Sequence, residues 1–133
     1  MAITRQTILK ALTVKQPWAS LIMSGIKQIE NRSWKPRVNV GERFVIHAGS
    51  GVADAKRIPK EFLATLPDER PKMLALGTVI LMGYHLPGED CDERCEVFGV
   101  PDAGYHWELG SPEWFDKPIQ IQGKLGMWPI SVE

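Results

Sequence analysis

Hydrophobic positions along the chain fall into short runs that are separated by polar and glycine-containing segments. The run TILKALTV at residues 7–14 is apolar, and RFVIHA at residues 43–48 is β-branched and alternating, so we predict a strand for each. The longest β signal covers residues 74–86, where Gly77 and Gly83 predict bulges or bends. The segments AGYHWEL and KPIQIQGKLGMWPISV predict two or three further short strands.

Helical patterns are few and lie early in the sequence. Pro17 suits the first position of a helix, because its missing N–H is not needed there, and Gly25 is a natural C-terminal stop. We therefore predict a short helix over residues 17–24. The segment VADAKRIPKEFLATL at residues 52–66 predicts a second helix that is broken before Pro59, and the acidic segment PGEDCDERCE predicts a loop.

The segment KQIENRSW at residues 27–34 has the alternation of a strand. Successive side chains of a strand point to opposite faces, so Glu30, Arg32 and Trp34 are expected on the same face. The resulting order is strand, helix, strand, strand, helix and strand, followed by more strands. Short strands, frequent glycines and few helices predict an α+β fold, a small mixed β-barrel flanked by two or three short helices.

The length of 133 residues is typical of a single domain, which we expect to cover residues 1–133. A hydrophobic content of 44% and a charged content of 24% are typical of globular proteins. The longest apolar run, MLALGTVILM, is about half the roughly 20 residues of a membrane-spanning helix. Arg5 and Lys10 interrupt the first segment before it resembles a signal peptide. With two cysteines, the sequence predicts a cytoplasmic protein with reduced thiols and no membrane partner.

Charge is unevenly distributed, although the formal net charge is zero. Residues 1–66 hold 11 Lys and Arg against 4 Asp and Glu, whereas residues 67–133 hold 5 against 12. A neutral protein is a poor non-specific binder of nucleic acid, because that affinity comes from phosphate neutralisation. The basic half can still form a local basic face, or the two halves can attract each other in the fold, and the sequence leaves both open.

The segment G-I-K-Q-I-E-N-R at residues 25–32 matches the pattern GxKxxExR. Together with its flanks, LTVKQPWASLI, FVIHAGSG and YHWEL…KPIQIQGKLGMW, it resembles the ASCH domain family over residues 12–128. The resemblance implies a PUA-like fold, a small β-barrel with a cleft between the barrel and the first helix. It also implies a role in binding RNA or in acting on nucleotides, and some relatives hydrolyse an acetyl amide on modified cytidine or act as ribonucleases.

Three charged residues of this motif are the main candidates for a site. Lys27 could hold a phosphate or activate a nucleophile, Glu30 could accept from a base amino group or act as a general base, and Arg32 could bind phosphate or stack on a base. The alternative is a salt-bridge cluster that closes the barrel near the end of the helix, or a mixture in which Glu30 orients Lys27. The acetyl-cytidine hydrolases that the family includes place a threonine, their proposed nucleophile, where this chain has Glu30. The resemblance therefore supplies no nucleophile here.

Further residues are candidates for the same cleft. Gln16 could offer amide hydrogen bonds and Trp18 a stacking platform for a base, although Trp18 also falls on the apolar face of the helix. His47 could line the cleft or be a structural histidine. Ser50 could cap the helix that is expected to follow it, or help that helix end to hold a phosphate.

Three candidates come from the second half of the chain. The aromatic residues among them could border the cleft or belong to the core, and the lysine could contact a phosphate or be a solvated turn residue. They are Tyr105, Trp107 and Lys124.

Cys91 and Cys95, together with His85 and His106, raise the question of zinc. The C-x3-C spacing is not that of a standard zinc knuckle, and the neighbouring Asp and Glu residues make the segment look merely acidic. The sequence therefore predicts no metal and no cofactor.

The function that these patterns favour is binding of RNA or of a nucleotide or modified base in a cleft. The first alternative is an enzyme, either an amidohydrolase on a modified nucleoside or a ribonuclease, with Lys27 as activating cation and Glu30 as acid or base. The second is a protein-interaction module that uses the acidic segment 89–96 to dock a protein partner.

Overall fold

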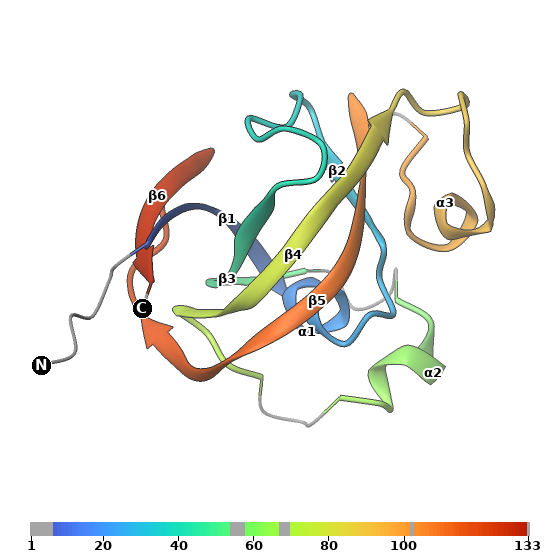
Figure 1. Ribbon diagram of the computed structural model, residues 1–133. Helices are drawn as coiled ribbons and strands as arrows, with labels where there is room; N and C mark the ends of the chain where they lie inside the picture. The colour runs from blue at the N-terminus through green and yellow to red at the C-terminus, as the bar shows by residue number, and fades with distance from the viewer. Residues whose placement is uncertain (1–6, 54–57, 67–69, 102, 133) are drawn as a thin grey trace, which may run out of the picture.

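The computed structural model describes residues 7–53, 58–66, 70–101 and 103–132. They form an α+β fold with one six-stranded mixed sheet and three short helices (Figure 1). The elements are β1 (Thr7–Gln16), α1 (Trp18–Met23), β2 (Ile29–Arg32), β3 (Arg43–Val52), α2 (Lys60–Leu63), β4 (Leu74–His85), α3 (Glu93–Phe98), β5 (Tyr105–Gln120) and β6 (Met127–Val132). No helix among the described residues is long and apolar enough to span a membrane.

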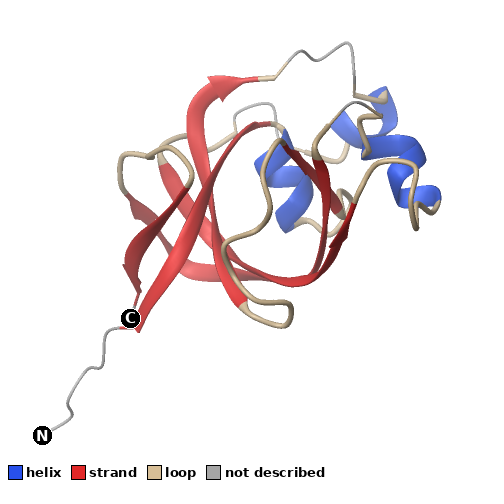
Figure 2. Ribbon diagram, turned by 90° about the horizontal axis from the view of Figure 1, so that it is seen from above, coloured by secondary structure: helices blue, strands red, loops and turns tan. Residues whose placement is uncertain are grey.

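The strands lie in the order β2-β5-β4-β3-β1-β6. β1 and β3 are parallel, and the other neighbouring pairs are antiparallel. The sheet is strongly curved, and the helices gather on the side away from β6 (Figures 1 and 2). The predicted α+β class with a mixed sheet is confirmed. Among the described residues β2 and β6 are the two edge strands and do not pair with each other, so the hydrogen bonds do not close the sheet into a barrel.

Both faces of the sheet carry a core, which explains why the strands read as nearly continuous apolar runs. Along β3, Phe44 and Ile46 join the cluster on the α1 side, whereas Val45 between them joins a second cluster with Trp128 of β6. Five of the six residues of α1 are buried, because this helix packs against β1, β3, β4 and β5. α1 is therefore fixed firmly at one end of the sheet.

The two glycines of β4 mark irregularities of pairing, as the sequence indicates. The register between β4 and β5 shifts between Ala75 and Gly77 and again between Leu81 and Gly83. A Cβ atom at Gly77 would lie 2.1 Å from the carbonyl oxygen of Glu113, so only glycine allows this close approach of the two strands. These shifts set which residues of β4 face which residues of β5.

Three expectations about elements need correction. Ser50 does not cap a helix, because β3 continues through Val52 and Ser50 lies within it. Of the helix expected over residues 52–66, the described residues contain only Lys60–Leu63, and residues 54–57 lie outside the description. The acidic segment is not simply a loop, because Asp92 caps the N-terminus of α3 by accepting a hydrogen bond from Arg94 N.

Candidate functional site

The turn after α1 directs Lys27 into the protein. Gly25 has a φ of 83°, a conformation that suits glycine, and it ends the helix. The backbone N–H groups of Ile26 and Lys27 both donate to the carbonyl oxygen of Leu21, at 3.1 and 3.0 Å. As a result the Lys27 side chain is buried, with a relative exposure of 3%.

A linear network of charges follows along β2. Lys27 Nζ donates to Glu30 Oε1 at 2.7 Å and also to the carbonyl oxygen of Ile29. The other carboxylate oxygen, Glu30 Oε2, accepts from Arg32 Nε and Nη2 at 3.1 and 2.9 Å. Arg32 Nη2 donates as well to the carbonyl oxygen of Thr13 on β1, at 3.0 Å. Glu30 is thus held between Lys27 from the turn before β2 and Arg32 from the same face of β2, the face that the alternation predicts for Glu30 and Arg32.

Glu30 stays ionised in this setting although it is buried. Burial by itself raises the pKa of the carboxyl group, but the charges of Lys27 and Arg32 and their hydrogen bonds lower it more. The net result is a pKa below the ordinary value of a glutamate. Glu30 therefore neutralises one of its two cationic neighbours at neutral pH and leaves the group with a net positive charge.

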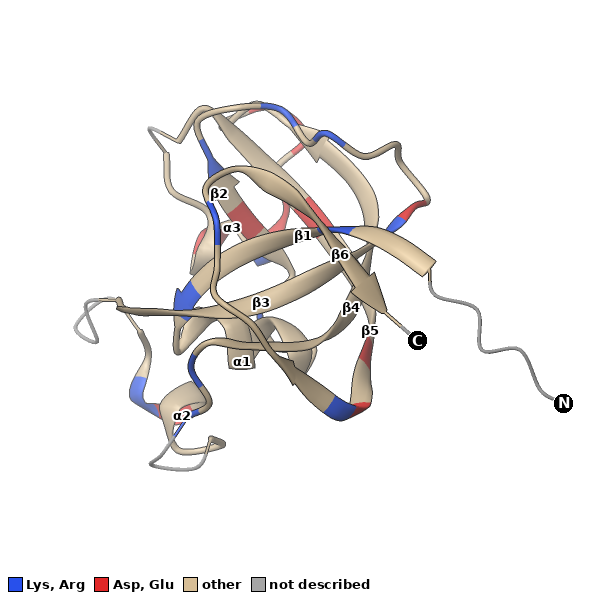
Figure 3. Cartoon of the chain, turned by 90° about the vertical axis from the view of Figure 1, so that its left-hand side faces the viewer, with Lys and Arg blue, Asp and Glu red and all other residues tan. Residues whose placement is uncertain are grey.

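The network lies at a pocket of about 600 Å³ that is formed between β1, β2 and the segment after α3. Side-chain exposure is 24% for Arg32 against 8% for Glu30 and 3% for Lys27, so Arg32 is the most accessible of the three. Basic residues lie on β1 and β2 on one side of the molecule (Figure 3). The pocket is lined by Thr13, Val14, Lys15, Trp18, Lys27, Glu30, Asn31, Arg32, Val52, Ala53, Val97, Phe98, Gly99, Val100 and Pro101.

The apolar wall of the pocket is built around Trp18 and Phe98. Their rings meet edge to face, with centroids 6.2 Å apart, and Lys27 Nζ lies 5.5 Å from the Trp18 centroid. The wall is fixed to β2 by Asn31, whose Nδ2 donates to the carbonyl oxygen of Phe98 and whose Oδ1 accepts from Val100 N, both at 2.8 Å. The pocket thus combines a cationic side with an apolar side.

The structure brings four of the ten sequence-predicted residues to this pocket, namely Trp18, Lys27, Glu30 and Arg32. Gln16 does not line it. Its side chain is buried, donates to the carbonyl oxygen of Pro71 at 2.8 Å and accepts from Ser20 N at 3.0 Å. These bonds tie the start of α1 to the segment before β4, a structural use of the amide.

The other predicted residues also lie elsewhere. His47 is fully buried between Thr13 Oγ1, at 3.2 Å, and the carbonyl oxygen of Ile121, at 2.6 Å. Trp107 is fully buried in the core and donates to the carbonyl oxygen of Trp34 at 3.2 Å. The remaining three do not line the pocket either, and they are Ser50 on β3, Tyr105 on β5, and Lys124, whose Nζ lies 6.0 Å from the Trp128 ring centroid.

Sequence reasoning did not identify Lys15 or Asn31 as pocket residues. Lys15 is exposed near the end of β1, a strand that does not pair with β2, and its only local signal is a charge before the first helix. Asn31 stands inside the motif itself, but its partners Phe98 and Val100 are nearly 70 positions away. No local pattern links these segments.

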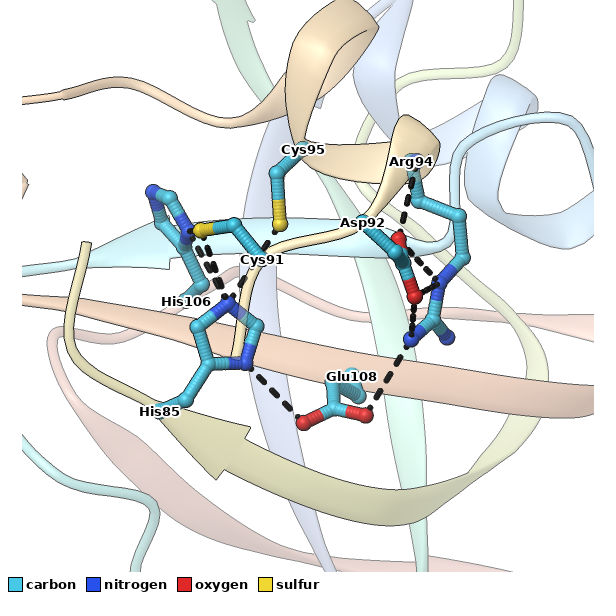
Figure 4. A network of polar contacts seen from close by, with 7 residues as sticks. All are labelled: His85, Cys91, Asp92, Arg94, Cys95, His106 and Glu108. Carbon is cyan, nitrogen blue, oxygen red and sulfur yellow. Dashed lines mark hydrogen bonds and ion pairs between the residues drawn. The ribbon is translucent and has the colours of Figure 1, made fainter. Parts of the chain in front are cut away.

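A second group of side chains gathers behind the pocket wall (Figure 4). One nitrogen or sulfur atom each of His85, Cys91, Cys95 and His106 lies within 4.8 Å of all the others. The two cysteines are not joined by a disulfide. Burial raises the pKa of the Cys95 thiol. The C-x3-C spacing of Cys91 and Cys95 therefore gives no indication of how closely the four residues approach one another in the folded chain.

Comparison with known proteins places these features in context. A sequence profile of the ASCH domain matches residues 12–119. The crystal structure of an ASCH protein from Zymomonas mobilis is similar with a TM-score of 0.52 at 16% identity, over 84% of this chain and 72% of that one. Two mutant forms of that protein match with the same TM-score, at 16% and 17% identity over 73% and 74% of their chains. At such identity the likeness concerns the fold alone, and no curated protein matches the chain.

Proposed function

The chain belongs to the ASCH domain family, and from this premise we propose that it binds RNA or a nucleotide in the pocket beside β2. We further propose that the chain is a single domain of PUA-like barrel architecture. The observation that carries the binding proposal is the fixed guanidinium of Arg32, which Glu30 and Thr13 hold from one side at the edge of the pocket.

Arg32 keeps donors for a ligand. Its Nε and Nη2 bind inside the protein, whereas Nη1 makes no hydrogen bond within the described part of the chain. A guanidinium that is already oriented loses little side-chain entropy when it binds a phosphate. Lys15, which is exposed at the same pocket, adds a second cation for the backbone of a nucleic acid.

The apolar wall suits a base. Trp18 and Phe98 present aromatic surface next to the cations, and base–aromatic stacking is a general way to hold single-stranded nucleic acid. A volume of about 600 Å³ falls in the range of small-molecule sites, so one nucleotide or a few fit better than a duplex. The zero net charge of the chain agrees with a short ligand, since the chain has no net positive charge to attract a long polyanion.

The same geometry favours binding over acid–base chemistry. Both carboxylate oxygens of Glu30 accept from cations, and the lowered pKa makes this group a poor proton acceptor near neutral pH. Lys27 is buried and paired with Glu30, so it is not placed as a freely accessible nucleophile activator. Glu30 and Lys27 therefore act as supports that orient Arg32.

The test compares Arg32→Gln with Arg37→Gln. Arg37 is exposed, stacks on Trp34 and does not line the pocket, so it is a control for the loss of one positive charge. Binding of AMP and of a labelled six-nucleotide RNA would be measured at several salt concentrations. We expect Arg32→Gln to weaken RNA binding by about 10-fold or more and to lower the salt slope by about one phosphate contact, and Arg37→Gln to change affinity less than twofold.

Equal affinities of wild type and Arg32→Gln would contradict the proposal. If the same incubations of wild type convert the RNA or a modified cytidine to product, the enzyme alternative replaces simple binding. If neither ligand binds the wild type, the acidic segment 89–96 becomes the surface to test with protein partners.

A further inference from the structure

The second cluster joins three elements and the segment between them. His85 is at the end of β4 and His106 is near the start of β5, and the two are direct partners across the antiparallel ladder. Cys95 lies in α3, and Cys91 precedes the helix cap. Figure 4 shows the two sulfur atoms and the two imidazole rings converging on one point.

Four of the six separations among these atoms match a tetrahedral metal site, and all four atoms lie within 4.8 Å of one another. Zinc binds nitrogen at about 2.0–2.1 Å and sulfur at about 2.3 Å, so tetrahedral ligands lie about 3.3 Å apart for two nitrogens and about 3.6 Å for nitrogen and sulfur. The observed distance from His85 Nε2 to His106 Nδ1 is 3.2 Å. Cys91 Sγ lies 3.5 and 3.6 Å from these two nitrogens, and Cys95 Sγ lies 3.3 Å from His85 Nε2.

The outer hydrogen bonds of the two histidines fix which nitrogen atoms face inward. His106 Nε2 lies 2.9 Å from the carbonyl oxygen of Val100, which can only accept, so this nitrogen carries the hydrogen. His85 Nδ1 lies 3.0 Å from Glu108 Oε2 and donates to that carboxylate. In neutral rings, His85 Nε2 and His106 Nδ1 then point lone pairs at each other across 3.2 Å.

Two facing lone pairs at this distance repel unless a cation or a donated hydrogen lies between them. Metal-binding histidines characteristically donate their outer N–H to a carboxylate or a backbone carbonyl, as both rings do here. The supporting shell extends further, because Glu108 Oε1 accepts from Arg94 Nη2 at 3.2 Å. The cluster therefore has both the inner donors and the outer supports of a metal centre.

From this arrangement we infer that His85, Cys91, Cys95 and His106 bind one Zn²⁺ ion in a structural site. Soft thiolates with imidazoles select zinc over Mg²⁺ or Ca²⁺, and four protein ligands leave no open position for catalysis. Binding displaces the two thiol protons to solvent, so one Zn²⁺ with two thiolates and two neutral imidazoles forms a neutral centre. Three of the four residues are buried and Cys91 is exposed.

The ion would hold the pocket wall in place. α3 contacts the sheet mainly through β2, and the wall residues follow its C-terminal end. Val100 is tied on one side to Asn31 at the pocket and on the other to His106 in the cluster. This role in shaping the pocket depends on the proposed function, whereas zinc binding itself does not.

Metal titration of the reduced, metal-depleted protein tests the inference directly. Zn²⁺ would be titrated against a coloured chelator, and Co²⁺ would be used as a spectroscopic probe for tetrahedral coordination and thiolate-to-metal absorption. We expect one equivalent per chain for the wild type and at least 100-fold weaker binding for Cys91→Ser. Cys91→His keeps four ligands, so it should retain one equivalent with weaker thiolate absorption.

His47→Gln is the matched control, because His47 is the one histidine outside the cluster and its partners Thr13 and Ile121 can bond to an amide. It should bind metal like the wild type. No stoichiometric metal uptake by the reduced wild type would overturn the inference, as would Cys91→Ser binding as tightly as the wild type. A Cys91–Cys95 disulfide in the isolated protein, with no metal uptake after reduction, would assign the thiols to redox chemistry instead.

Discussion

The two polar clusters of this protein differ in how their polar groups are satisfied inside the protein. At Lys27, Glu30 and Arg32, one buried carboxylate forms short ion pairs with a buried lysine and a partly exposed arginine, and the group keeps one net positive charge. At His85 and His106, the two rings direct their outer N–H groups to Glu108 and Val100 and their inner nitrogens to a shared point. The first cluster pairs its charges internally and leaves Arg32 Nη1 for a ligand, whereas the second turns two sulfur and two nitrogen atoms toward one point.

This difference separates two kinds of site. An ion-pair network that satisfies itself orients one exposed group, here Arg32, and adds little chemistry of its own. A set of converging lone pairs is costly unless a cation or a donated hydrogen lies between them, and four donor atoms around one point fit a bound metal. Changes that leave either cluster half-complete should therefore have the largest effects, and the predictions below use this to separate the two.

Glu30→Gln should have the largest effect on stability. Without the carboxylate, Lys27 Nζ remains buried beside Arg32 with no counter-charge, and breaking a buried pair in this way costs about 3–5 kcal/mol. The free energy of unfolding, measured with urea, should fall by about this amount. The control is Glu113→Gln, which removes the surface pair with Arg43, where the glutamate side chain is 69% exposed, and should cost less than about 1 kcal/mol.

Equal losses for Glu30→Gln and Glu113→Gln would contradict this view of the first cluster. The pair of Lys27 and Glu30 would then be exposed to water. The contrast between a buried ion-pair network and a metal centre would not hold.

Removal of zinc should have the next largest effect. When free zinc exceeds its dissociation constant about 100-fold, the metal stabilises the folded state by about 2.7 kcal/mol. Chelation should therefore lower the unfolding temperature and speed hydrogen exchange at the α3 amides Cys95 N and Gly99 N, whose acceptors are the carbonyl oxygens of Asp92 and Cys95. Amides of the central strand β3 report global unfolding, so their change in rate is the reference for the loss of overall stability, and the α3 amides should remain less protected than they are. Identical exchange rates of the α3 amides with and without chelator would show that the metal does not stabilise this helix.

The first cluster was largely predictable from sequence, for a local reason. Lys27, Glu30 and Arg32 lie within six positions, and strand alternation alone puts Glu30 and Arg32 on one face. What sequence could not show is which residue stays accessible. The accessibility of Arg32 depends on its hydrogen bond to the carbonyl oxygen of Thr13, which lies on β1, a strand that does not pair with β2. The burial of Lys27 depends on the tight turn after α1.

The second cluster was not predictable, because its geometry depends on long-range register. His85 and His106 meet only after three irregularities in the pairing of β4 with β5 have been placed correctly. A single shift would move one ring to the opposite face of its strand. The C-x3-C spacing is also uninformative by itself, since Cys91 precedes the cap of α3 and Cys95 lies inside the helix. For Trp107 the sequence left the cleft and the core open, and the structure places it in the core.

The smallest expected effect is a pH dependence that belongs to the first cluster alone. The pKa of Glu30 is lower in the folded protein than its ordinary value of 4.5, so Glu30 binds its proton less readily in the folded than in the unfolded chain. Its contribution to stability is therefore fully present above the unfolded pKa and is lost as the pH falls through the folded pKa. Between these values, wild type should lose up to about 1.4 kcal/mol per pH unit through this group.

The measurement is the free energy of unfolding from pH 7 down to pH 3, for wild type and Glu30→Gln at equal zinc loading. Acid also protonates the two cysteine thiolates and releases zinc, but this loss is common to both proteins and cancels in their difference. The difference in stability should shrink below about pH 4.5 and stay constant above it. If instead the difference is constant throughout, Glu30 does not titrate as a group stabilised by Lys27 and Arg32. If the difference grows as the pH falls from neutral, the carboxyl group has a raised pKa, and an acid–base role for Glu30 would return as the better account of the pocket.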